Sequence, residues 1–75
     1  MEKLTNVKVG QYRKILALDG RAPIKIKRRL LELGFTAGQM IKVVRKSMFG
    51  DTYLIEVRGY YLSMRKSLTG YLIVE

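Results

Sequence analysis

The sequence predicts a mainly-β protein, a small barrel of about five short strands with one inserted α-helix. Three observations favour this fold class. The chain has 75 residues, enough for one hydrophobic core, so we predict a single domain over residues 1–75. Residues 23–34 repeat apolar side chains at a helical period. Much of the remaining chain has the composition or the alternation of β-strands.

The first strand is predicted at residues 12–18, where apolar and β-branched side chains are frequent. Asp19-Gly20 follows this run directly. Because this dipeptide favours a turn, we expect the strand to end there.

The predicted helix starts at Pro23, which suits a first helical turn because its missing amide hydrogen would have no partner there. Ile26, Leu30 and Leu33 lie at i, i+4 and i+7, on one side of the helix. Gly34 suits the left-handed position just beyond the helix end. We therefore expect a surface helix whose apolar side packs on the barrel.

Three further strands follow the helix. Residues 40–44 and 52–58 alternate apolar with other side chains, and residues 60–65 form the partner strand across a tight Arg58-Gly59 turn. Residues 71–74 supply the last strand. The core residues predicted from this alternation are Tyr53, Ile55 and Val57.

The sheet edges decide the architecture. Residues 66–70 leave room for only one helical turn before the last strand, so the fold consists mostly of strands. A meander of five short strands must hide both of its edges, and curling into a barrel does so at small size. We predict a barrel of the SH3-like kind.

The charge of the chain favours anionic partners. There are 15 Lys and Arg against 6 Asp and Glu, a formal net charge of +9. Such a charge attracts nucleic acid, acidic lipid and acidic protein alike, and does not choose among them. The chain has no cysteine, its first residues lack the apolar run of a secretory signal, and no apolar stretch is long enough to span a bilayer. We expect a cytoplasmic protein.

The side chains offer little catalytic or metal-binding chemistry. Histidine and cysteine are absent, and the six acidic residues form no close pair in the sequence, so we expect no enzyme activity and no cofactor. Ferrous iron favours imidazole, carboxylate or thiolate ligands, so any contact with Fe²⁺ or another divalent metal should be weak. The acidic residues are Glu2, Asp19, Glu32, Asp51, Glu56 and Glu75.

Several segments together resemble the FeoA family, and the similarity runs almost end to end. They are Arg28-Arg29-Leu30-Leu31-Glu32-Leu33-Gly34-Phe35-Thr36-Ala37-Gly38, Gly50-Asp51, Arg58-Gly59-Tyr60, Leu62-Ser63-Met64-Arg65 and Ile73-Val74-Glu75. The resemblance implies a small cytoplasmic SH3-like domain that assists the bacterial ferrous iron transporter FeoB, a membrane protein with its own cytoplasmic GTPase. Related domains form the C-terminal part of some metal-dependent repressors.

Two segments depart from the family pattern. The loop that commonly reads proline, apolar, Gly-Asp-Pro is Met48-Phe49-Gly50-Asp51-Thr52 here, with neither proline. An alanine-rich turn before the last strand is replaced by Leu68-Thr69-Gly70. Both departures predict looser connections.

The predicted helix carries the first candidate contact surface. Lys25, Arg28 and Arg29 share its polar side, which Lys27 extends, and Arg28 and Glu32 are spaced for an i, i+4 ion pair. Such a face is commonly just solvated. In the context of the family we favour a role in steering the protein toward the transporter's GTPase domain or the neighbouring anionic lipid headgroups.

Met48 and Phe49 are the second candidate contact. Two large apolar residues in a loop have either a core to reach or a partner to meet, and the sequence leaves both interpretations open.

Three alternative functions remain open at this stage. A basic small barrel can bind oligonucleotides, although we expect no specific nucleic acid partner. A metal-sensing domain is disfavoured by the missing histidines. A peptide groove is the third alternative, although tyrosines at strand positions are more often ordinary sheet packing. Its candidate aromatic residues are Tyr53, Tyr60, Tyr61 and Tyr71.

Overall fold

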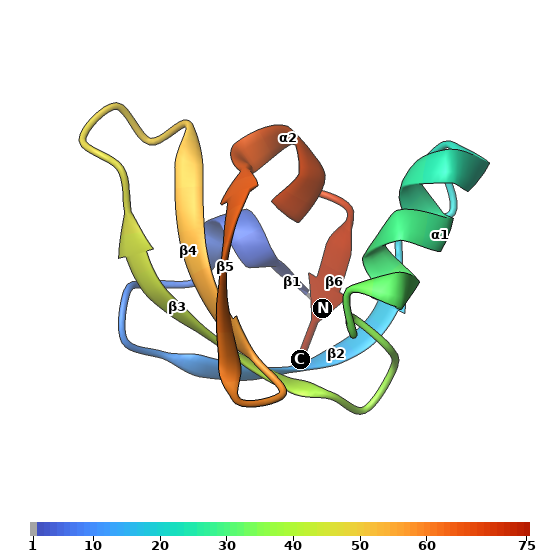
Figure 1. The fold of residues 1–75 in the computed structure, drawn as a ribbon, viewed down its shortest axis with the longest axis horizontal. Coiled ribbons are helices and arrows are strands. Elements are labelled where there is room, and N and C mark those ends of the chain that lie inside the picture. Colours follow the sequence, from blue (N-terminus) through green and yellow to red (C-terminus); the bar gives the residue numbers. More distant parts are fainter. Residues whose placement is uncertain (1) are drawn as a thin grey trace.

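The computed structural model describes residues 2–75 and has the predicted mainly-β architecture (Figure 1). Within these residues, six strands and the helix α1 account for most of the fold, together with two single turns of helix. The elements in chain order are β1 (Glu2–Lys3), the 3₁₀ turn η1 (Leu4–Asn6), β2 (Tyr12–Leu18), α1 (Ile24–Glu32), β3 (Met40–Lys46), β4 (Thr52–Val57), β5 (Tyr60–Arg65), α2 (Lys66–Thr69) and β6 (Leu72–Val74).

All neighbouring strands are antiparallel, in the order β1-β6-β2-β3-β4-β5. Strand β2 belongs to both halves of this sheet. Its residues 12–14 pair with β3, whereas its residues 15–18 pair with β6. The register shifts between Ile15 and Ala17, and β3 has a similar shift between Val43 and Arg45. Such irregularities bend and twist a strand, which lets the sheet curl around one core.

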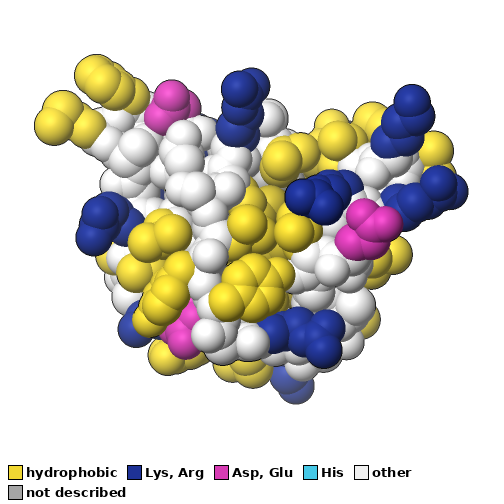
Figure 2. Space-filling view, viewed as in Figure 1, with side chains coloured by type: hydrophobic (Ala, Val, Ile, Leu, Met, Phe, Trp, Pro, Cys, Tyr) yellow, Lys and Arg dark blue, Asp and Glu magenta, His cyan; other side chains and the backbone are white. Residues whose placement is uncertain are grey.

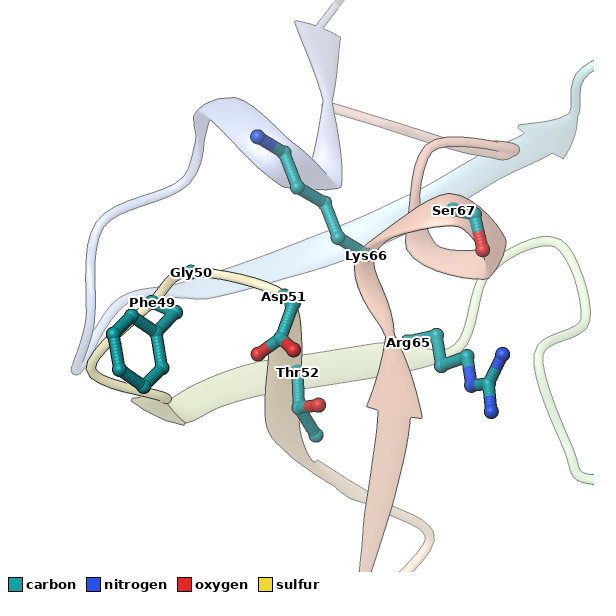
Figure 3. Close-up of a pocket in the computed structure, with 7 residues that line it drawn as sticks. All are labelled: Phe49, Gly50, Asp51, Thr52, Arg65, Lys66 and Ser67. Atoms are coloured by element: carbon teal, nitrogen blue, oxygen red, sulfur yellow. The ribbon is translucent and has the colours of Figure 1, made fainter.

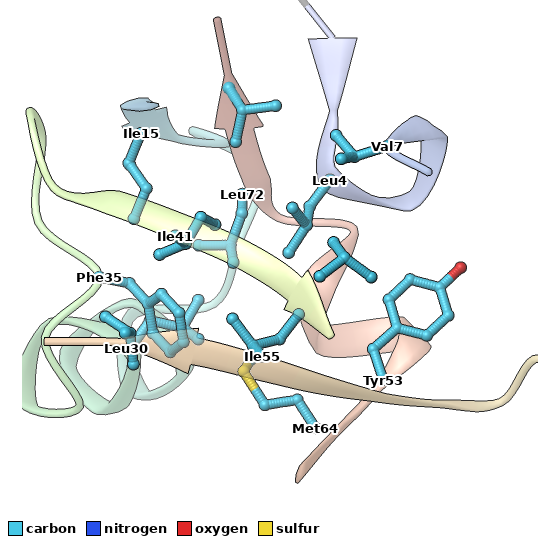
Figure 4. Packing of buried hydrophobic residues seen from close by; sticks show 13 residues of the cluster. Leu4, Val7, Ile15, Leu30, Phe35, Ile41, Tyr53, Ile55, Met64 and Leu72 are labelled. Atoms are coloured by element: carbon cyan, nitrogen blue, oxygen red, sulfur yellow. The ribbon is translucent and has the colours of Figure 1, made fainter. Parts of the chain in front are cut away.

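The core lies inside this curl and draws on nearly every element (Figure 4). The three predicted core residues are confirmed, since Tyr53, Ile55 and Val57 are 3%, 0% and 1% exposed. Phe35, just beyond α1, is fully buried with them. Each large apolar side chain buried in this way contributes about 1.5–3 kcal/mol of transfer free energy.

The helix α1 has the predicted amphipathic arrangement, with different details at its ends. Leu30 is buried on its inner side, while Ile26 and Leu33 pack against the core. Pro23 precedes the helix with extended backbone instead of lying in the first turn. The expected ion pair between Arg28 and Glu32 is not formed. Glu32 pairs instead with Arg29, and the guanidinium nitrogen and the carboxylate oxygen are 4.0 Å apart.

The amino-terminal segment was not predicted as structure. Glu2 and Lys3 pair with Val74 and Ile73, and the turn that follows buries Leu4 completely. Val7 is also buried. The segment therefore adds both an edge strand and core side chains to the barrel. Across residues 2–75, no helix combines the length and hydropathy needed to cross a bilayer.

Candidate functional site

The polar side of α1 is the first surface to which the sequence analysis pointed. Lys25, Arg28 and Arg29 are exposed on it, and Figure 2 shows cationic side chains projecting from this end of the molecule. Lys27 differs from the prediction. It is only half-exposed, because its position flanks the buried side of the helix. The exposed basic face therefore consists of three cations, and Glu32 lies among them.

Contacts from the β4–β5 turn fix the carboxyl end of α1. Gly34 has a φ of +104°, and a Cβ at this position would stand 2.6 Å from Cδ of Arg58. Arg58 and Gly59 both have positive φ, 51° and 83°, so the predicted tight turn is confirmed. The Tyr60 hydroxyl donates a hydrogen bond to the carbonyl of Leu33. The turn therefore holds the basic face in one orientation relative to the sheet.

The β3–β4 connection is the second candidate surface, and the core interpretation of its apolar residues is wrong. Met48 is 93% exposed and Phe49 is 88% exposed. Both lie at the tip of the hairpin, where Figure 2 shows hydrophobic side chains projecting from the molecule. Figure 1 places this tip and α1 on opposite sides of the protein, so the candidate residues form two separate surfaces.

Ser47 organises the hairpin tip without either proline of the family pattern. Its hydroxyl donates to the Asp51 carboxylate at 2.7 Å and accepts from the amides of Asp51 and Thr52, both at 3.1 Å. The Gly50 amide donates to the Ser47 carbonyl at 2.9 Å. The Ser47 hydroxyl also lowers the pKa of Asp51, with smaller contributions from the Asp51 amide, the Thr52 side chain and Arg65. Asp51 is therefore charged at neutral pH and turned back into the loop.

An open hollow of about 600 Å³ lies between the hairpin tip and the start of α2 (Figure 3). Phe49, Asp51 and Thr52 line one side, and Arg65 and Lys66 line the other. The Lys66 amide donates to the Asp51 carbonyl at 2.8 Å and joins the two sides. Two cations thus border this hollow on the side of α2.

The four candidate tyrosines do not share one aromatic surface. Tyr53 is buried, and Tyr60 is committed to the helix end through its hydroxyl. Tyr71 is half-buried, which leaves Tyr61, at 63% exposed, as the most open of the four. This arrangement gives the peptide-groove hypothesis no support.

Carboxylates capable of holding a metal do not gather in the part of the chain that the structure describes. Residues 2–75 contain no group of three or more His, Cys, Asp or Glu side chains placed to share an ion. Asp19 is instead engaged by Arg21 and Lys3, and hydrogen bonds from these two cations hold its pKa well below the usual range. The same pairing raises the pKa of Arg21.

The sequence matches the model of one protein family, the FeoA domain, over residues 2–75. The chain belongs to the FeoA family. No curated protein is significantly similar to it. Membership supports a role in ferrous iron transport.

Solved FeoA structures share the fold of this FeoA chain. FeoA from Chlorobium tepidum is 29% identical with a TM-score of 0.87, over 97% of this chain and 68% of that one. The FeoA-like protein from Clostridium acetobutylicum gives the same identity and TM-score, over 100% of this chain and 88% of that one. Zinc-bound FeoA from Stenotrophomonas maltophilia is 26% identical with a TM-score of 0.87, over 100% and 91%. That protein is described as an SH3 domain protein and suggested as a ferrous iron transport activating factor.

The fold also occurs inside metal-dependent repressors. A manganese-dependent transcriptional repressor has a TM-score of 0.88 at 12% identity, over 99% of this chain and 35% of the repressor. At this identity the likeness concerns the fold alone. The SH3-like barrel predicted from the sequence is confirmed by the fold that this chain shares with the FeoA of Stenotrophomonas maltophilia, the SH3 domain protein above.

Proposed function

We propose that this FeoA protein is a non-enzymatic accessory of bacterial ferrous iron uptake that acts in the cytoplasm. It binds the cytoplasmic region of a FeoB-like membrane transporter, including its GTPase domain, at the inner face of the membrane. Family membership supports the role in iron transport. The contact with the transporter rests on the shape and charge of the domain.

The fixed basic face of α1 is the observation that carries this proposal. Lys25, Arg28 and Arg29 point to solvent from a helix whose end is held by Arg58 and Tyr60. A rigid cationic surface loses little conformational entropy on binding and accelerates encounter with a negatively charged partner. The exposed apolar side chains of the same helix, Ile24 and Leu31, are 67% and 49% exposed and add contact area.

Charge reversal tests the proposed contact. The triple variant Lys25→Glu/Arg28→Glu/Arg29→Glu should lower the association rate with the transporter's purified cytoplasmic domain by about tenfold or more at low salt, because it removes electrostatic steering. Stopped-flow or surface-binding kinetics measure this rate. Circular dichroism confirms that the variant is folded.

The matched control reverses three cations away from the helix, Lys8→Glu/Lys14→Glu/Arg45→Glu, and therefore has the same net charge. It should slow association much less. An equal loss in both variants would mean that only the total charge matters, and an unchanged rate in the helix variant would exclude the basic face as the contact.

A further inference from the structure

We infer that the β3–β4 tip inserts Met48 and Phe49 into the interface of an anionic lipid bilayer. This membrane contact uses a different surface from the proposed transporter contact and does not depend on it. The tip would place the protein on the membrane before the transporter is met.

The two apolar side chains lie outside the core formed by the described residues. At 93% and 88% exposed, Met48 and Phe49 are the most exposed large apolar residues among those the structure describes, and the next is Ile24 at 67%. Adjacent residues at the tip of a narrow hairpin cannot cover each other from water. Exposure of this kind marks an interaction surface.

Cations surround the base of the apolar tip. Arg45 and Lys46 end strand β3, where Lys46 pairs with Tyr53 and holds its ammonium 5.2 Å from the centre of that ring. Arg65 pairs with Thr52 on the other side of β4, and Lys66 follows it. Figure 3 shows the Phe49 ring at the outer end of the hairpin, the Lys66 chain extending toward this loop from the start of α2, and the Arg65 chain pointing away from it.

The one carboxylate at the tip offsets only one of these four positive charges. Asp51 is turned back toward Ser47, whose hydroxyl donates to it at 2.7 Å. Of the four nearby cations, Arg45, Arg65 and Lys66 are exposed. The tip region therefore keeps an excess of positive charge.

This order of apolar tip and cationic base fits a lipid surface. Apolar side chains bind at the boundary of headgroups and acyl chains, while Lys and Arg just above them meet anionic phosphates. A protein partner would have to supply a pocket for the two protruding side chains, lined by acidic groups. A bilayer with anionic headgroups offers both kinds of contact without a shaped pocket.

A tryptophan at the tip tests the insertion directly. The chain contains no tryptophan, so Phe49→Trp provides a single fluorophore. With vesicles of phosphatidylglycerol and phosphatidylcholine, its emission should shift to the blue and be quenched by lipids brominated on the acyl chains. With phosphatidylcholine vesicles alone, both effects should be much smaller, because the cations then have no anionic partner.

Variants separate insertion from general attraction. Met48→Ser/Phe49→Ser should weaken binding to the anionic vesicles by about tenfold to a hundredfold in a flotation assay, as expected for the loss of two apolar side chains. The matched control Val9→Ser/Met40→Ser removes two exposed apolar residues that lie outside both proposed contact surfaces, and it should bind the vesicles like the wild type. Both substituted pairs are exposed, so the variants should remain folded.

Three results would overturn the inference. One is an unshifted tryptophan emission from the Phe49→Trp variant while the protein floats with anionic vesicles, which means electrostatic attachment without insertion. Another is the absence of vesicle binding. The third is a Met48→Ser/Phe49→Ser variant that keeps its affinity for vesicles but no longer binds the transporter's cytoplasmic domain. That result would mean that the tip contacts a protein and not a membrane. Failure of the α1 charge-reversal test would leave these vesicle results unaffected.

Discussion

At the scale of single residues, Asp19 connects three parts of the chain. It lies at the end of β2, accepts a hydrogen bond from the Arg21 amide at 2.9 Å, and pairs with the Arg21 guanidinium at 3.1 Å. Lys3 of the edge strand β1 also donates to it. The residue is buried, at 7% exposed, so its charge needs these partners. Asp19 thus fastens both the amino-terminal strand and the turn that leads into α1.

Acid should weaken the fold through Asp19. Its pKa is held far below the usual value of an Asp carboxyl, so the folded state favours the charged form. The stabilisation is therefore complete at neutral pH, begins to fall as the pH drops through about 4, and is lost below the folded-state pKa. Urea unfolding between about pH 7 and pH 2 measures this slope.

The isosteric variant Asp19→Asn serves as the comparison for this experiment. It should be less stable than the wild type at pH 7, and the difference should shrink as the pH falls. A constant difference across the pH range would show that the ionisation of Asp19 contributes nothing.

At the scale of elements, the end of α1 and the β4–β5 turn form one unit. Gly34 follows the helix in a backbone conformation that other residues rarely adopt, and the Arg58 side chain lies directly against it. The two segments are far apart in sequence, yet the Arg58 side chain packs on Gly34 and the Tyr60 hydroxyl bonds to the Leu33 carbonyl. The turn thereby sets the direction in which the basic face points.

Gly34→Ala should destabilise the protein by about 2 kcal/mol or more, because an L side chain at this φ is strained and its Cβ would also displace Arg58. Thermal or urea unfolding measures the loss. Gly38→Ala is the control, since Gly38 has a φ of +90° but nothing lies within 4 Å of an added Cβ.

The control variant should therefore lose less stability than Gly34→Ala. Equal losses would show that only the backbone conformation matters and that the contact with Arg58 is unimportant.

Elements that depend on a local sequence pattern could be predicted, whereas elements that depend on pairing between distant segments could not. The period of α1, its glycine end and the Arg58-Gly59 turn are local patterns, and the structure confirms them. Strand β1 has two residues, too few to show any period. Its existence depends on pairing with β6 at the other end of the chain. The exchange of partners along β2 is equally non-local.

The candidate site was predictable only in part, for the same reason. The helical period places Lys25, Arg28 and Arg29 on one face, but it does not show that Lys27 is only half-exposed. The sequence around Met48 and Phe49 has no feature that tells an inward loop from an outward one. Ser47 does indicate a turn at this point, because a Ser before Gly-Asp can accept hydrogen bonds from the nearby backbone, but it does not indicate which way the two apolar side chains point.

At the scale of the whole molecule, the positive charges far outnumber the carboxylates that could pair with them. The net charge is +9, and in residues 2–75 the carboxylates paired with a cation are those of Glu2, Asp19, Glu32 and Glu75. The radius of gyration is only 11.0 Å. Many like charges therefore repel each other across a small protein. This repulsion lowers the free energy of unfolding, and the same charge favours binding to anionic surfaces.

Salt should stabilise the isolated protein. Raising NaCl from about 0.01 M to about 0.15 M shortens the screening length from about 30 Å to about 8 Å, below the radius of gyration. The midpoint of thermal unfolding should then rise by about 2–5 °C.

The variant Lys8→Gln/Arg45→Gln has less charge to screen and should show a smaller rise. A midpoint that falls with salt would show that the ion pairs outweigh the repulsion.

The pairing of β1 with β6 has a consequence for how this domain can be used. Glu2 lies beside Val74, so the chain enters and leaves the barrel at one place (Figure 1). A module with adjoining ends can be attached to a larger polypeptide without opening its sheet. The repressor in which the same barrel occupies about a third of the chain is an arrangement of that kind. The same barrel can thus be built into a longer chain without a change in its sheet.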